Sequence, residues 1–185
     1  MEDHEIVALY WERDESAIRE TDRKYGGFCQ KIALNLLGIR EDAEECVSDT
    51  YLAAWNAMPV QRPALLRSWL GRVVRNLSVD RWRKSRAQKR YAGMELLLSE
   101  LDECVPSPMT AERAAEAREI SGVIDRWLRT LKEEDRDLFL RRYWNGDRLD
   151  ELARERGMSQ NTLAQRMRRL RLSLKDVLEK EGVDL

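Results

Sequence analysis

Amide and guanidinium side chains gather near the end of the sequence, between Ser159 and Lys175, where no aspartate or glutamate occurs. Asparagine and glutamine pair with the edge of adenine, and arginine pairs with guanine or holds a phosphate. At about 100° per residue, a helix over this segment has one polar and one apolar side. The polar side carries Asn161, Gln165, Arg168 and Arg169, with Leu172 among them. These residue types at this spacing predict a helix that contacts double-stranded DNA.

The elements that would position this helix form a helix-turn-helix pattern over residues 149–174. Such a motif needs a small residue in its first helix and a turn residue that tolerates positive φ. Ala153 and Gly157 meet these needs, and Ser159 is a natural N-cap for the second helix. The apolar residues that would lock the two helices together are Leu149, Leu152, Met158 and Leu163. The alternative is an amphipathic helical hairpin with a solvated basic face.

A second basic block lies in the first half of the chain. Between Arg62 and Arg90 the sequence has ten basic residues and a single acid, Asp80. Within residues 68–86, arginine and tryptophan share the side of the expected helix away from its apolar stripe, which suits stacking on unpaired bases and neutralising their phosphates. The residues of this set are Trp69, Arg72, Arg75, Asn76, Trp82, Arg83 and Arg86. Trp82 is the expected exposed ring, whereas Trp69 is equally consistent with a place in the core.

An acidic amphipathic helix is expected just before this block, over residues 41–55, EDAEECVSDTYLAAW. Its polar face offers Glu41, Glu45 and Asp49, which do not suit contact with a polyanion. In a protein with basic DNA-facing surfaces, an acidic face indicates a protein partner. An ordinary solvated helix surface is the alternative.

Helical spacing of apolar residues recurs in both halves of the chain, and glycine and proline are scarce. From Tyr25 to Leu36 the apolar residues follow a helical period, and Gly38 is a plausible stop. Pro106 and Pro108 interrupt an acidic middle segment. We therefore expect an all-α protein of two small helical domains, residues 1–91 and 108–185. An acidic linker, residues 92–107, would join them.

Metal, cofactor, membrane and catalytic chemistry are not expected. Cys29, Cys46 and Cys104 are widely spaced and His4 is the only histidine, so the usual zinc-ligand spacing is missing. The start, MEDHEIVALY, is acidic and unlike a signal peptide, and no apolar stretch approaches the roughly 20 residues that span a bilayer. We expect a soluble cytoplasmic protein without membrane insertion. With no phosphate-binding glycine loop and no apolar carboxylate cluster, no enzyme is indicated.

Three segments, in this order, resemble RNA polymerase sigma factors of the extracytoplasmic-function type. Residues 41–55 are similar to the region-two helix that docks on the clamp helices of the polymerase β′ subunit. Residues 68–86, SWLGRVVRNLSVDRWRKSR, are similar to the segment that melts and reads the minus-ten element. Residues 131–171 are similar to region four, which reads the minus-thirty-five element in the major groove. The resemblance runs from about Tyr25 to Leu178, with an unmatched linker.

The resemblance implies a transcription initiation factor that binds promoter DNA and core RNA polymerase, the latter through the β′ clamp helices and the β flap. An anti-sigma factor is a further candidate partner. The resemblance also implies that Asn76 helps to capture a flipped minus-ten base, which the Pro59–Ala64 loop would hold. The residues that it places on polymerase are Glu41, Asp42, Glu45, Asp49 and Trp55. The residues that it places on the minus-thirty-five element are Gln160, Asn161, Thr162, Gln165, Arg166 and Arg169, to which the helix face adds Arg168.

Two positions depart from the family pattern. Ala164 and Gln165 stand where the family usually has lysine and serine, so its minus-thirty-five preference does not transfer. The loop PVQRPA lacks the family's common Phe-Arg-Gly character, which leaves the base pocket undefined. Arg166 projects from the side of its helix, which suits a phosphate contact better than base reading.

A regulator that binds duplex DNA and never enters the polymerase is the main alternative. It would explain residues 149–174 equally well. It would not explain why a helix rich in tryptophan and arginine follows an acidic helix in the other half. Promoter-specific transcription by core polymerase distinguishes the two, because a simple regulator would not support it.

Overall fold

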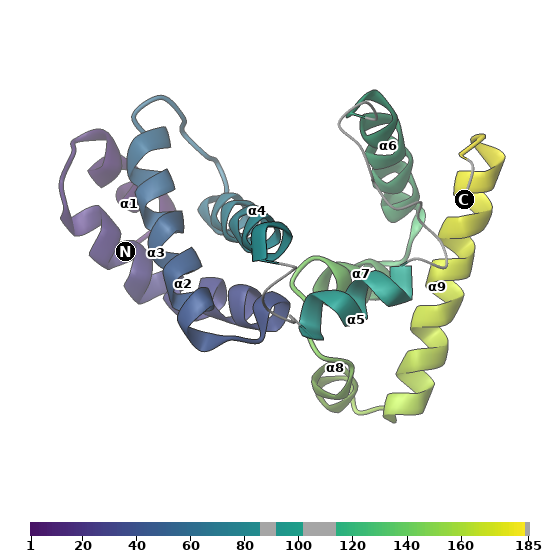
Figure 1. Ribbon diagram of the computed structural model, residues 1–185. Coiled ribbons are helices and arrows are strands. Elements are labelled where there is room, and N and C mark those ends of the chain that lie inside the picture. Colours follow the sequence, from purple (N-terminus) through teal and green to yellow (C-terminus); the bar gives the residue numbers. More distant parts are fainter. Residues whose placement is uncertain (86–91, 102–113, 184–185) are drawn as a thin grey trace. The chain divides into compact units, whose positions relative to one another are not determined.

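The computed structural model describes residues 1–85, 92–101 and 114–183, and every regular element within these ranges is an α-helix. The chain divides into two compact units, Met1–Met94 and Glu95–Leu185. The expected all-α fold is therefore confirmed (Figure 1). No helix in the described part is long and apolar enough to cross a membrane.

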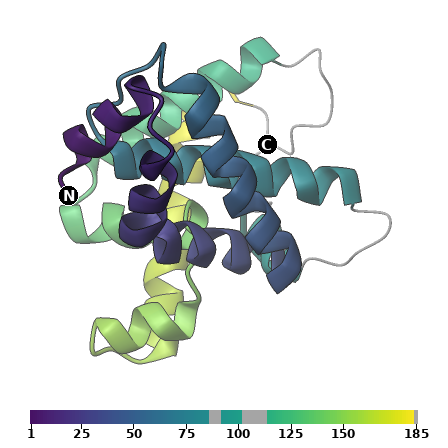
Figure 2. The ribbon, with the colours of Figure 1, turned by 90° about the vertical axis from the view of Figure 1, so that its left-hand side faces the viewer.

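Four helices form most of the first unit: α1 (Asp3–Trp11), α2 (Ser16–Leu37), α3 (Arg40–Ala57) and α4 (Leu66–Ser85). Helices α2, α3 and α4 pack against one another, and α1 packs on α2 (Figure 2). The expected stop at Gly38 is confirmed, because this residue ends α2 with a φ of 69° and its N–H bonds to the Leu34 carbonyl. The core between the helices includes Ile32, Leu36, Leu66, Leu70 and Val74.

Helix α4 comes very close to α2 at Gly71. A Cβ atom at this position would lie 3.2 Å from the ring of Phe28, tighter than most packed side chains allow. The glycine therefore sets how closely α4 can approach α2, and α4 is the helix that carries the tryptophan- and arginine-rich segment.

The second unit contains α6 (Ala114–Thr130), α7 (Glu133–Tyr143), α8 (Leu149–Glu155) and α9 (Gln160–Lys180). Helix α9 is the centre of this unit, since α6, α7 and α8 all pack on it. An aromatic cluster joins α6 to α7, with ring centroids 4.8 Å apart for Trp127 and Phe139. The apolar side of α9 is buried through Leu163, Met167, Leu170, Leu174 and Leu178.

The segment at residues 92–107, for which the sequence predicts a linker, begins with a helix, α5 (Ala92–Leu101). The helix is held because its Leu97 is buried and its Glu100 bonds to residues of α7. The Glu100 carboxylate accepts hydrogen bonds from Tyr143 at 2.9 Å and from Nε of Arg142 at 3.2 Å. Arg142 is only 3% exposed, so this carboxylate neutralises a buried cation. Residues 102–107 and the expected domain start at Pro108 lie outside the described residues.

Candidate nucleic-acid interface

The helix-turn-helix in the second unit has the geometry that its sequence predicts. Gly157 lies between α8 and α9 with a φ of 63°, in the left-handed region that glycine adopts at little cost. Ser159 caps α9, and its side-chain oxygen accepts a hydrogen bond from the Thr162 backbone N–H at 3.0 Å. Ala153 and Leu163 are buried between the two helices. The pattern therefore forms a fixed corner that orients the first turns of α9.

The outer face of α9 is open to solvent. The exposed residues on its first three turns include Gln160, Asn161, Thr162, Gln165, Arg168 and Arg169. No ion pair involves Arg168 or Arg169 within the described part of the chain. Amide and guanidinium groups on an exposed helix without acids can bond to base edges and phosphates. We call these six residues the α9 face.

Arg166 differs from its neighbours because α7 holds it. Its Nε donates to Asp135 at 2.6 Å, and its NH2 lies 3.2 Å from a carboxylate oxygen of Glu134. These bonds, first the one to Asp135, raise the pKa of the Arg166 guanidinium. The guanidinium that we expect to contact DNA is thus bound by two carboxylates of the same unit. Through these bonds Arg166 joins α7 to α9.

Helix α4 presents an exposed stripe along one side. At about 100° per residue, Trp69, Arg72, Asn76 and Arg83 fall within an arc of about 60°. Arg72, Asn76 and Arg83 are exposed, and Trp69 is half-buried. An indole, an amide and two guanidinium groups in one row suit unpaired nucleotides, which offer ring faces and phosphates together. We call these four residues the α4 stripe.

Two other members of the set predicted on α4 lie off this stripe. Trp82 is only 9% exposed, which corrects the expectation of an exposed ring at this position. It follows Leu70, Val74 and Ser78 at steps of four residues and so continues the buried side of the helix. Arg75 is half-buried, and burial lowers the pKa of its guanidinium. Arg86 lies outside the described residues.

The chain between α3 and α4 forms a loop beside the α4 stripe. Its residues Val60 and Leu65 are 85% and 69% exposed, which is unusual for aliphatic side chains. Gln61 accepts a hydrogen bond from the Trp69 indole N–H at 3.1 Å, so the loop is tied to the first turn of α4. The Pro59–Ala64 segment and the α4 stripe therefore form one surface.

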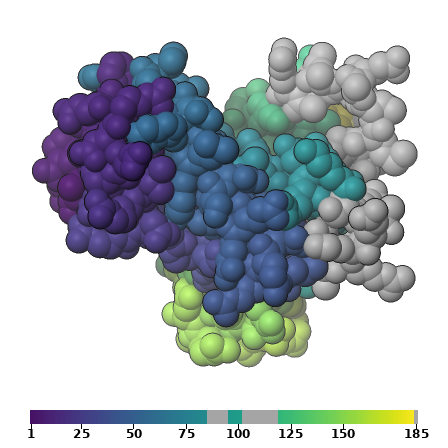
Figure 3. All heavy atoms as spheres, turned by 60° about the vertical axis from the view of Figure 1, so that its left-hand side comes forward, coloured from purple at the N-terminus to yellow at the C-terminus, as the bar shows by residue number. Residues whose placement is uncertain are grey.

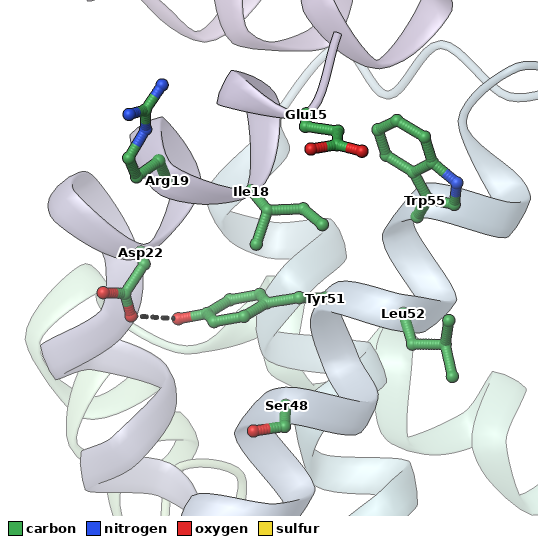
Figure 4. A pocket seen from close by; sticks show the side chains of 8 residues that line it. All are labelled: Glu15, Ile18, Arg19, Asp22, Ser48, Tyr51, Leu52 and Trp55. Carbon is green, nitrogen blue, oxygen red and sulfur yellow. Dashed lines mark hydrogen bonds between the residues drawn. The ribbon is translucent and has the colours of Figure 1, made fainter. Parts of the chain in front are cut away.

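Helix α3 and the start of α2 border a groove of about 840 Å³ (Figure 4). On its floor, the Tyr51 hydroxyl donates to Asp22 at 2.7 Å. Leu52, at 58% exposed, and the half-buried Trp55 give one wall apolar surface. This part of the first unit, in blue, lies at the molecular surface in Figure 3.

The acidic residues predicted on α3 divide into two kinds. Glu41, Glu45 and Asp49 are exposed. Asp42 is buried at 6% exposed and accepts a hydrogen bond from Arg81 of α4 at 2.9 Å. Arg81 also donates to Glu45 at 2.7 Å, and this bond raises the pKa of the guanidinium. Asp42 therefore fixes α3 to α4 inside the bundle. The resemblance implies a place for this residue on the polymerase-binding surface, whereas the structure buries its side chain.

The chain is similar to a known family in its first unit and to known proteins over most of its length. The family model described as Sigma-70 region 2 matches residues 22–88, which run from α2 through α4. The chain is 29% identical over 161 residues to the ECF RNA polymerase sigma factor SigL of Mycobacterium tuberculosis, covering 80% of this chain and 82% of that protein.

Two further similarities were found. The chain is 26% identical over 137 residues to a probable RNA polymerase sigma factor, RfaY, of Xanthomonas campestris pv. campestris. That alignment covers 74% of this chain and 34% of RfaY, so the chain spans about a third of the length of this relative. A solved structure of CnrH in complex with the cytosolic domain of CnrY is similar with a TM-score of 0.46 and 22% identity, over 96% of this chain and 97% of that chain.

Proposed function

Because this chain belongs to the RNA polymerase sigma factors of the extracytoplasmic-function type, which direct core polymerase to promoters, we propose that its two units recognise two separate promoter elements. The observation that carries this proposal is the exposed α9 face, which has no acidic residue and lies on the second, capped helix of the helix-turn-helix. A helix presented in this way suits the major groove of duplex DNA. We assign it to the minus-thirty-five element.

The α9 face divides into base-reading and phosphate-binding positions. Asn161 and Gln165 are one helical turn apart and carry amides, the groups that pair with adenine. Arg168 and Arg169 are the exposed cations that follow. Arg166, which α7 holds through Asp135, supports the helix instead of contacting DNA.

The α4 stripe and the Pro59–Ala64 loop are assigned to the melted minus-ten element. Asn76 offers an amide to an unpaired base, and the half-buried Trp69 offers an aromatic ring two turns earlier on the same side of the helix. Arg72 and Arg83 supply charge for the phosphates on the same side of the helix. Unpaired bases need both kinds of contact, which supports single-stranded rather than duplex DNA here.

The groove beside α3 is assigned to core polymerase, through the β′ clamp helices. Leu52 and Trp55 provide an apolar anchor, and the exposed Glu41 and Asp49 provide charge for a basic partner. An apolar centre with a polar rim is the usual anatomy of a protein interface. For the second unit we propose the β flap as the polymerase contact. We expect an anti-sigma factor, as the other candidate partner, to act by covering the groove.

Run-off transcription with core polymerase and this chain tests the whole assignment. We expect promoter-specific transcripts from the wild-type chain, and none from core polymerase alone. Leu52→Glu should abolish transcription and binding to core polymerase, while Leu34→Glu, at a leucine that is 40% exposed and outside the groove, should keep both. If the chain binds duplex DNA but never supports transcription with core polymerase, it is a simple regulator and the assignment is wrong.

Separate binding measurements test the two DNA assignments. Asn76→Ala should weaken binding of the holoenzyme to single-stranded minus-ten DNA, with duplex binding unchanged. Arg169→Ala should weaken duplex binding alone by about fivefold to tenfold. Lys180→Ala, at an exposed lysine in the last turn of α9, controls for the loss of one positive charge.

A further inference from the structure

Three side-chain contacts tether the loop between α3 and α4, and two of them come from Trp11 at the end of α1. The Trp11 indole N–H points to the Gln61 carbonyl oxygen at 3.4 Å. The Arg62 guanidinium lies over the Trp11 ring, 3.5 Å from its centroid. The Trp69 indole N–H bonds to the Gln61 side chain at 3.1 Å. Consecutive loop residues are thus held between α1 and α4.

Trp11 lies outside the segment that matches the region-two model, which begins at residue 22. Trp11 is 37% exposed, so it lies at the edge of the bundle and outside the core. Tryptophan is the most favourable ring for a cation–π pair, and a guanidinium stacked on it keeps its edge accessible. Arg62 itself is exposed, so the stack fixes its direction while leaving its N–H groups open to solvent.

Backbone hydrogen bonds from the Val60 and Gln61 N–H groups to the Ala57 carbonyl, at 3.1 and 2.9 Å, hold the first turn of the loop. The side chains add little to this, because Val60 is 85% and Leu65 is 69% exposed. A loop that must order itself around a base loses conformational entropy on binding, and ordering it beforehand removes that cost. The contacts with Trp11 and Trp69 give this ordering before any DNA arrives.

We propose that Trp11 is a positioning residue for promoter recognition. With Arg62 stacked on its ring, it holds the Pro59–Ala64 loop in the form that receives an unpaired minus-ten base. This inference rests on the assignment of the loop and the α4 stripe to minus-ten DNA. It extends the recognition surface from α4 to α1, a helix without any DNA-binding chemistry of its own.

The test uses holoenzyme, assembled from core polymerase and the full chain, and a pool of fork-junction DNA with a randomised single-stranded minus-ten segment. Sequencing the bound fraction gives a base preference at each position. Trp11→Ala should reduce the preference at one position by about threefold to tenfold. Trp11→Phe keeps a ring for Arg62 and should retain most of it, whereas Arg62→Ala should lose it. Loss of fold alone would not act at one position.

Arg67→Ala is the matched control. Arg67 also makes a cation–π pair, 4.5 Å from the centroid of Phe28, but on α2 and not on the loop. Arg67→Ala should leave the base preference unchanged, and any loss of affinity should be the same for all sequences. Thermal unfolding of each variant shows whether α1 still packs; if Trp11→Ala does not fold, Arg62→Ala and Trp11→Phe decide the question.

The outcomes separate this inference from the proposed function. Should Asn76→Ala flatten the preference while Trp11→Ala and Arg62→Ala leave it intact, Trp11 has no positioning role. Should none of these variants change it, the assignment of α4 and its loop to minus-ten DNA fails as well.

Discussion

Asp135 on α7 accepts a 2.6 Å hydrogen bond from Arg166 on α9, 31 residues further along the chain. The bond joins the helix before the helix-turn-helix to the helix that we assign to DNA. It also removes one arginine from the outer surface of α9. Arg166 lies between the exposed face, which includes Gln165, and the buried face, which includes Met167.

Arg166→Ala should therefore affect stability more than DNA binding. We expect amide protons of α7 and α9 to lose about 1 kcal/mol of protection in hydrogen exchange, because a half-buried ion pair is lost. DNA affinity should change by less than about twofold. In contrast, Arg168→Ala should leave protection unchanged and reduce the salt slope of binding by about one. Equal effects of the two substitutions on the salt slope would place Arg166 on a phosphate after all.

Glu100→Ala should destabilise the second unit strongly. It leaves the Arg142 guanidinium, 3% exposed, without its carboxylate, and breaking a buried pair from one side costs about 3 kcal/mol. Hydrogen exchange along α7 and α9 in the full chain would measure the loss. Glu95→Ala, at an exposed glutamate of the same helix, is the control and should change nothing. A small effect of Glu100→Ala would mean that water replaces the carboxylate easily and that α5 is not held through this residue.

Two arginines of α4, only two positions apart, should separate stability from DNA binding. Arg81→Ala removes the ion pair of Arg81 with the buried Asp42, and we expect the free energy of unfolding of the first unit in urea to fall by about 2 kcal/mol. Arg83→Ala, on the exposed α4 stripe, should keep stability and weaken binding to single-stranded DNA. The reverse pattern would contradict the division of this helix into a buried and an exposed side.

The two described cysteines should resist alkylation in the folded protein. Burial raises the pKa of the Cys29 thiol to about 12, and burial also raises the pKa of Cys46. At pH 8 only about one Cys29 in ten thousand is then a thiolate, the form that reacts. Iodoacetamide followed by peptide mass spectrometry should find both cysteines unmodified at pH 8, and modified once urea is added. Rapid labelling without denaturant would show that α2 or α3 opens locally.

The helix-turn-helix could be predicted from sequence because its parts are local. The turn glycine, the serine cap and the apolar residues lie within about four turns of chain, and each acts on its near neighbours. Gly157 and Ser159 accordingly have the conformations that their residue types indicate. The long helices of the first unit follow the same logic, since their apolar residues repeat at the helical period.

Partners far apart in sequence could not be predicted in this way. Trp82 looks exposed among arginines, yet the buried row through Val74 and Ser78 reaches it, and extending that row by one turn would have found it. For Arg166 and Asp42 no such local pattern exists. Their partners lie 31 and 39 residues away, and only the packing of one helix on another brings them together. Helix α5 is similar, because Glu100 meets Arg142 across 42 residues.

The shared arginine between α3 and α4 has a thermodynamic consequence. Glu45 faces solvent on the side assigned to polymerase, while Arg81, its partner, belongs to the helix assigned to melted DNA. A polymerase side chain that draws Glu45 away leaves Arg81 with Asp42 alone and changes the free energy of holding α4 in place. Reciprocity of binding free energies then requires DNA bound to α4 to change the affinity of polymerase for α3 by the same factor. Occupancy of the two surfaces of this small bundle is in that case a single coupled equilibrium.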